Sequence, residues 1–173
     1  MRTSRTLISV GGALTAAVFA GVLNPATASA NEKWALNGTY QATSNGEWAT
    51  SNDVFHDERS VRSIWTISST CSYPTECTGT VSSDAGWTAP IYQTGGDWRV
   101  KRVIEDWMPC QDGTTAPPGL QVIRFHGSTP GGDQTDPTSN TLVGQDSTTG
   151  QPGACGRSLA LFINMPFKLI KLT

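Results

Sequence analysis

Four cysteines are the residues whose spacing restricts the chemistry of this sequence most. Cys71 and Cys77 stand close together, whereas Cys110 and Cys155 lie far away, which is unlike the paired C-x₂₋₄-C spacing of structural zinc sites. An even number of cysteines is typical of a disulfide framework when a chain is exported, as the signal-peptide pattern of the first thirty residues predicts for this one. We therefore predict two disulfide bridges. Four cysteines allow three pairings.

The sequence around the first two cysteines favours one of these pairings. Five residues separate Cys71 from Cys77, as in the loop of a β-hairpin. If the two cysteines face each other across that hairpin, Ile67 faces Val81 on the same side of the sheet as the disulfide. A slip of one residue would turn both apolar side chains to the other face. We therefore predict the bridges Cys71–Cys77 and, by elimination, Cys110–Cys155.

Histidine, a common general base in hydrolases, occurs only at His56 and His126. No Gly-x-Ser-x-Gly nucleophile elbow is present, and Ser128 two positions after His126 is not by itself a triad spacing. The simpler interpretation is that His126 ends a strand and faces solvent. We therefore predict no catalytic residue and no enzyme activity.

The acidic residues provide no further candidate for a metal site or a catalytic pair. Asp133 and Asp136 lie in a polar loop after two glycines, but a calcium loop needs more oxygen ligands in a fixed pattern. Glu105 and Asp106 are neighbours, so on a strand they would point to opposite faces. We predict no metal site and no cofactor.

Six tryptophans and a short basic cluster are the remaining candidates for binding. Most of the tryptophans should fill the core of a small β domain, and Trp65 shares the face of Ile67. Trp87 and Trp98 lie near glycines at strand ends, where pockets open. Arg102 shares a strand face with Trp98, so it either marks the strand's end, enters a polar pocket or belongs to a solvated face. We predict Trp87, Trp98 and Arg102 as ligand-binding residues.

Short alternating segments must position these side chains, because glycine, proline and small polar residues recur too often for long helices. Gly95-Gly96 predicts a hairpin turn, and Pro166 should interrupt the last segment. The spans 112–118 and 128–140 are predicted loops, the second of them disordered. The predicted strands are 36–42, 61–71, 77–83, 88–94, 98–104, 120–126, 141–146, 159–165 and 167–172. Strands joined in this way predict a small antiparallel barrel of about eight short strands, the alternative being a β-sandwich.

The first thirty residues have the three parts of a signal peptide. Arg2 and Arg5 supply positive charge, residues 7–23 form an uncharged apolar run, and Ala28-Ser29-Ala30 offers the small residues that a signal peptidase recognises. A membrane anchor would need an apolar run of about 20 residues, and no basic cluster follows this one. We predict cleavage after Ala30 and a secreted, extracellular product that begins at Asn31 and has no membrane span.

The predicted mature chain, residues 31–173, is a single domain. Cleavage leaves 173 − 30 = 143 residues, enough to bury about two-thirds of the unfolded surface. Removing Arg2 and Arg5 from 12 basic residues leaves 10 against 14 acidic ones, a net charge of −4. Without a basic excess, the chain is not expected to bind nucleic acid.

Several stretches of the chain resemble a group of small secreted proteins of mycobacteria and related actinobacteria. These stretches are Leu36-Asn37-Gly38-Thr39-Tyr40, Asn45-Gly46-Glu47-Trp48-Ala49, Trp65-Thr66-Ile67, Cys71 with Cys77-Thr78-Gly79-Thr80-Val81, Gly86-Trp87-Thr88-Ala89-Pro90-Ile91-Tyr92 and Met165-Pro166-Phe167-Lys168-Leu169. The resemblance covers nearly the whole predicted mature chain. It implies export and supports the disulfide pattern, but that group has no assigned activity, so it implies no catalytic residue.

A secreted, disulfide-bridged β domain without a catalytic set is most typical of a non-enzymatic binding or interaction module. If the barrel is closed, a small apolar molecule carried inside it is the natural ligand. The alternatives are an extracellular hydrolase that uses His126 and a surface-recognition protein that binds an extracellular protein partner. An exposed apolar patch centred on Trp87 or Trp107 would favour the last of these.

Overall fold

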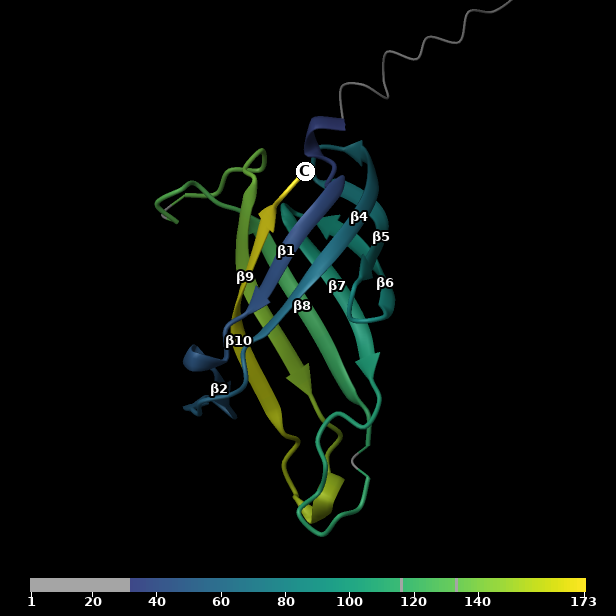
Figure 1. The fold of residues 1–173 in the computed structure, drawn as a ribbon, viewed down its shortest axis with the longest axis vertical. Helices are drawn as coiled ribbons and strands as arrows, with labels where there is room; N and C mark the ends of the chain where they lie inside the picture. The colour runs from purple at the N-terminus through teal and green to yellow at the C-terminus, as the bar shows by residue number, and fades with distance from the viewer. Residues whose placement is uncertain (1–31, 116, 133) are drawn as a thin grey trace, which may run out of the picture.

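An antiparallel barrel of eight strands forms the body of the protein in the computed structural model, which describes residues 32–115, 117–132 and 134–173 (Figure 1). The barrel strands are β1 (Gly38–Ser44), β4 (Val61–Tyr73), β5 (Glu76–Ser83), β6 (Trp87–Thr94), β7 (Asp97–Ile104), β8 (Gly119–Gly127), β9 (Thr141–Thr149) and β10 (Phe162–Lys171). Each strand pairs with the next, and β10 pairs with β1 to close the sheet. The prediction of an all-β barrel is confirmed, and the sandwich alternative is wrong. The predicted signal peptide lies outside the described residues.

The hairpin of β4 and β5 has the predicted register. Cys71 pairs with Cys77, and Ile67 pairs with Val81. Both predicted disulfides are present, with 4.0 Å between the Cα atoms of Cys71 and Cys77 and 5.2 Å between those of Cys110 and Cys155. The β6–β7 hairpin turns at Gly95-Gly96, where both residues have the positive φ angles that glycine adopts without strain.

Strand β10 is continuous through Pro166, although the sequence predicts an interruption there. The carbonyl oxygen of Pro166 accepts a hydrogen bond of 2.8 Å from the N–H of Asn45, the residue that follows β1. Strand β1 itself ends opposite Phe167. The missing N–H of the proline therefore faces the point at which β1 leaves the sheet, so no ladder hydrogen bond to β1 is lost.

The sequence pattern does not predict two short strands that lie outside the barrel. Strand β2 (Thr50–Ser51) pairs with β10 and with β3 (Val54–Phe55), and the two form a small hairpin on the flank of β10. Three single-turn 3₁₀ helices complete the described chain: η1 (Glu32–Trp34), η2 (Gly46–Trp48) and η3 (Ala154–Gly156). Strands of two residues are too short to show the alternation by which longer strands are predicted.

The 128–140 loop, which the composition predicts to be disordered, is folded where the structure describes it. Ser128 forms an isolated bridge with Thr135 and is only 2% exposed. The N–H of Asp136 donates to the carbonyl of Gly127 over 2.9 Å, so the loop returns to the end of β8. Asp133 lies outside the described residues, and the Asp133–Asp136 pair considered for calcium is therefore not described as a pair.

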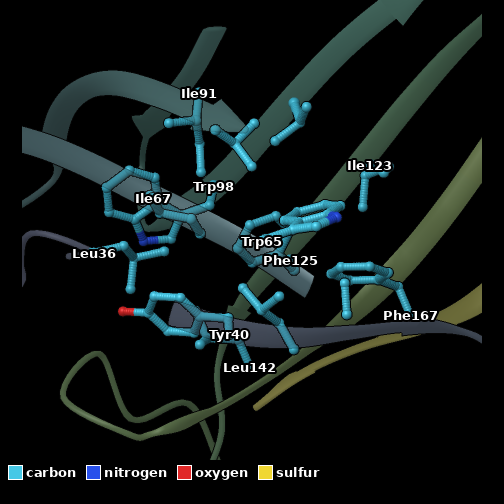
Figure 2. Close-up of a cluster of buried hydrophobic side chains, with 14 of the residues drawn as sticks. Leu36, Tyr40, Trp65, Ile67, Ile91, Trp98, Ile123, Phe125, Leu142 and Phe167 are labelled. Atoms are coloured by element: carbon cyan, nitrogen blue, oxygen red, sulfur yellow. The ribbon is translucent and has the colours of Figure 1, made fainter. Parts of the chain in front are cut away.

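Alternate residues of the barrel strands point inward and form a packed core (Figure 2). Trp65, Phe125 and Phe167 stack near its centre, with ring centroids 5.3 to 6.4 Å apart. Each fully buried aromatic or aliphatic side chain contributes about 1.5–3 kcal/mol through the hydrophobic effect. The centre of the barrel is therefore filled by the protein's own side chains, as is usual for a barrel of eight strands.

One end of the barrel, which we call the closed end, is covered by the segment that precedes β1. Leu36 lies over this end and is bound to Ser69 of β4 by a reciprocal pair of hydrogen bonds, each 2.9 Å long. The side chain of Asn37 adds a second pair of hydrogen bonds with the backbone of Ser69. Buried polar groups are thus satisfied where the chain crosses the barrel end.

Candidate functional site

At the opposite end of the barrel, which we call the mouth, polar side chains point inward. The inward positions of β7 are apolar at Trp98 and Val100 but become polar at Arg102, two residues further on. Other strands also place polar residues inward near this end of the barrel. Four of these residues are in contact with one another: Ser44 of β1, Arg102 of β7, Gln121 of β8 and Asp146 of β9.

These four side chains form one hydrogen-bonded chain, which we call the mouth network. The hydroxyl of Ser44 donates to Oδ2 of Asp146 over 2.6 Å, and Nε2 of Gln121 donates to both carboxylate oxygens over 2.8 and 3.0 Å. Nε of Arg102 in turn donates to Oε1 of Gln121 over 2.5 Å. Gln121 therefore bridges the cation and the carboxylate, and its amide orientation is set by both.

The guanidinium group of Arg102 also stacks on an aromatic ring. Its Cζ atom lies 4.4 Å from the ring centroid of Trp87, at the start of β6. Trp87 in turn meets Trp65 edge to face, with the ring centroids 5.4 Å apart and the planes at 83°. The cation–π contact holds the guanidinium plane in place, and the second tryptophan anchors that contact to the packed core.

A cavity of about 200 Å³ lies against the mouth network. Its polar lining comes from the four network residues and Ser63, and its apolar lining includes Val61, Trp65, Trp87, Ile123 and Phe167. The cavity therefore combines a few convergent polar groups with an apolar wall, which is the usual composition of a small-molecule site.

Burial shifts the two charged groups of the network toward their neutral forms. Desolvation raises the pKa of the Asp146 carboxyl above its usual value, opposed by the hydrogen bonds from Ser44 and Gln121 and by the charge of Arg102. Desolvation also lowers the pKa of Arg102, opposed by the charge of Asp146. Asp146 is 3% exposed, whereas Arg102 is half-buried. The cation therefore lies nearer to solvent than the carboxylate.

Arg102 has no direct counter-ion among the described residues. The ion pairs there join His56 to Glu58, and Asp97 to both Arg124 and His126. Arg102 reaches Asp146 only through Gln121. A half-buried cation without a contacting anion is a feature of binding sites more than of structural ion pairs.

The structure brings together two of the three sequence-predicted ligand-binding residues. Trp87 and Arg102 line the mouth cavity and contact each other. Trp98 lies on the far side of the core, toward the closed end, and is 3% exposed. Sequence reasoning missed Asp146. The same alternation that places Arg102 inward on β7 places Asp146 inward on β9, so comparing the inward positions near the mouth end of each strand would have found it.

A second cavity, of about 290 Å³, lies among the loops beyond the mouth. It is lined by the Cys110–Cys155 disulfide and by apolar side chains that include Trp107, Met108, Leu159 and Leu161. It is larger than the mouth cavity, but the buried polar network does not extend to it. The carboxyl of Asp112 in its lining has a lowered pKa, caused mainly by hydrogen bonds with Thr114 at an exposed position and not by burial. We therefore take the mouth as the candidate site.

His126, the residue of the hydrolase alternative, lies away from both cavities. It belongs to β8, pairs with Val143 of β9 and is 39% exposed at its side chain. Its Nδ1 atom lies 3.5 Å from a carboxylate oxygen of Asp97, which also binds Arg124. The side-chain contact of His126 among the described residues is with a carboxylate and not with a hydroxyl nucleophile, so the geometry gives the hydrolase alternative no support.

The described residues contain neither a candidate metal cluster nor a membrane-spanning helix. No three His, Cys, Asp or Glu side chains gather there in an arrangement that could hold a metal ion. In the same residues, no helix has the length and hydropathy needed to cross a membrane.

The fold and the mouth define a class, a small disulfide-bridged antiparallel barrel with a polar site at one end. No protein-family model matches the sequence, and no curated protein matches it significantly. Solved structures do match the fold. One of them is the monomer form of the M. tuberculosis PknI sensor domain. Its similarity to this chain has a TM-score of 0.56 and 17% sequence identity, and covers 80% of this chain and 88% of that domain. At this identity the likeness shows a shared fold.

Proposed function

We propose that the protein is a non-enzymatic binding module of the extracellular space, with its ligand site at the mouth. The observation that carries this proposal is the half-buried Arg102 guanidinium, stacked on Trp87 in a partly apolar cavity without a contacting counter-ion. Burying such a cation costs free energy, and a ligand that completes its hydrogen bonds offsets this cost.

Two further findings support the extracellular part of the proposal. Both disulfides are of the kind that persists in oxidising compartments, and the sequence carries the parts of a signal peptide. The similar fold described above belongs to a domain called a sensor domain. A binding role for this chain agrees with that description, which names no catalysis.

Because the core is packed, a ligand that this protein carries would bind outside the centre of the barrel. An apolar molecule enclosed in the centre of the barrel would compete with Trp65, Phe125 and Phe167 for space. We therefore propose a ligand bound at the mouth, in contact with both its polar network and its apolar wall.

A surface-recognition function is the second candidate, and one observation favours it. Three large apolar side chains are strongly exposed near the β2–β3 hairpin, with exposed fractions of 70% for Trp48, 69% for Val54 and 65% for Phe55. Clustered exposed apolar side chains mark contact surfaces in many proteins. Trp87 and Trp107 themselves are both half-buried, so this patch is not centred on either of them.

An NMR fragment screen of the purified protein separates the two candidates. We expect hits to shift the indole N–H signal of Trp87 and the Nε–H signal of Arg102. These hits should lose affinity in Trp87→Ala and keep it in the matched control Trp48→Ala. If hits map only to Trp48 and Phe55, surface recognition replaces the mouth site. If they map only to the cavity of Trp107, the mouth assignment is wrong.

A further inference from the structure

We propose that the ligand of the mouth is a small organic carboxylate, whose carboxylate binds Arg102 and whose apolar part packs against the cavity wall. This inference rests on the proposed function and names the chemical class of ligand for the same site. It follows from the donors, acceptors and shape that the mouth presents to solvent.

The hydrogen-bonding groups that remain available are donors. A guanidinium group carries five N–H donors. Among the described residues, Gln121 alone accepts from that of Arg102, and it does so at Nε, so the two terminal nitrogens keep their hydrogens for a ligand. Parallel N–H donors of this kind match the two oxygens of a carboxylate.

A cationic ligand lacks an equivalent partner. Both oxygens of Asp146 already accept hydrogen bonds, from Ser44 and Gln121, and the side chain is 3% exposed behind them. The burial of the carboxylate behind these two side chains keeps a ligand cation from direct contact with it. The exposed charge of the mouth is therefore positive, even though the network holds one group of each sign.

The walls of the cavity define the rest of the ligand. Trp87 covers one face of the guanidinium group, and the apolar wall continues along Val61, Ile123 and Phe167. A volume of about 200 Å³ leaves space for a small molecule only. A bare inorganic anion would satisfy Arg102 but leave this wall in contact with water, whereas a carboxylate on a flat apolar group uses both.

Benzoate is a suitable probe, with benzamide as its uncharged analogue and acetate as the carboxylate without an apolar part. We expect benzoate to shift the Arg102 Nε–H and Trp87 indole signals of the purified protein in NMR titrations. It should bind about tenfold or more tightly than either analogue, because charge-assisted hydrogen bonds and apolar contact each contribute on that scale.

Variants at two arginines of the same strand test the role of Arg102. Arg102→Gln should weaken benzoate binding about tenfold or more, and Arg102→Lys should retain the preference over benzamide with lower affinity because it lacks the planar fork. The matched control Arg99→Gln, whose position is turned to the other face of β7, should bind benzoate as the natural protein does. Thermal melts of each variant confirm that the barrel is intact.

Each contrary result has a separate meaning. If benzamide or benzylammonium shifts the mouth signals with affinity equal to or above that of benzoate, the carboxylate class is wrong while the mouth remains a binding site. If acetate equals benzoate, the apolar part of the proposal is wrong. If none of the four probes shifts the mouth signals while other fragments do, the ligand class fails alone. Only a screen without any hit at the mouth overturns the proposed function as well.

Discussion

The two ends of the barrel use the same strand alternation for opposite purposes. At the closed end the inward positions are mostly apolar, and the buried polar side chains of Ser69 and Gln93 are uncharged and hydrogen-bonded. The segment before β1 covers this end through the hydrogen bonds of Leu36 with Ser69. At the mouth the inward positions become polar, and Arg102 and Asp146 are linked by Gln121 beside a cavity. From this contrast we infer that the closed end contributes more to stability, whereas the mouth has less apolar packing and holds the proposed site.

The two tryptophans predicted to bind a ligand test this contrast most strongly. Trp98→Ala should cost about 3–5 kcal/mol of unfolding free energy, because it removes a fully buried aromatic side chain. Trp87→Ala should cost clearly less, since Trp87 is half-buried at the mouth. Urea denaturation of both variants measures the difference. Equal costs would show that the mouth is part of the stabilising core.

The two disulfides allow a second comparison of the ends. Cys110–Cys155 closes the longer loop, with a separation of 45 against 6 for Cys71–Cys77. Removing both cysteines of the long bridge should therefore cost about 4 kcal/mol, against about 2 for the short bridge, if chain entropy dominates. Thermal melts of the two double Cys→Ala variants provide the measurement. The opposite order would identify the β4–β5 hairpin, where Cys77 is 1% exposed, as the organising centre of the fold.

The hydrogen bonds that seal the closed end predict a smaller effect. Ser69→Ala should reduce the unfolding free energy by about 1–3 kcal/mol, because the buried N–H and carbonyl of Leu36 lose their partner. Ser82→Ala, at an exposed position of the neighbouring strand β5, is the matched control and should change stability by less than about 0.5 kcal/mol. Hydrogen exchange at Leu36 would report directly whether the seal opens.

The pH dependence of stability tests the mouth through Asp146. Its pKa is raised in the folded state, so the folded protein binds a proton that the unfolded chain releases more readily. The contribution of Asp146 to stability is therefore greatest below the unfolded pKa and is lost as pH rises through the folded pKa. In Asp146→Asn this loss should disappear. Urea melts between about pH 4 and pH 8 should show the stability of the variant, relative to the natural protein, rising with pH. A constant difference across this range would contradict a raised pKa.

Much of the fold could be predicted because it depends on local patterns. Alternation located the barrel strands, and the spacing of Cys71 and Cys77 with Ile67 and Val81 set the register of one hairpin. Pro166 misled the prediction because its tolerance depends on where β1 leaves β10, a contact between distant segments. Local patterns cannot contain that information.

The candidate site was predicted less completely for the same reason. Trp87, Trp98 and Arg102 share the local signs of a strand end, yet only Trp87 and Arg102 face the mouth. The seal over the closed end depends on a hydrogen bond between residues 33 positions apart. The partner of Ser44 at the mouth, Asp146, lies 102 positions away in sequence. The pairing of β1 with β4 brings Leu36 to Ser69, and the closure of the barrel between β1 and β10 brings Ser44 to Asp146.

The position of the C-terminal residue also determines how the protein can be presented to a ligand. Thr173 accepts a hydrogen bond of 3.1 Å from Thr39 at the start of β1, so it lies at the closed end, beside η1 and far from the mouth loops (Figure 1). A tether attached to Thr173 would hold the barrel with its mouth directed away from the supporting surface. Immobilised protein prepared in this way would keep the Arg102 cavity accessible, whereas coupling through the 105–118 or 150–161 loops would obstruct it.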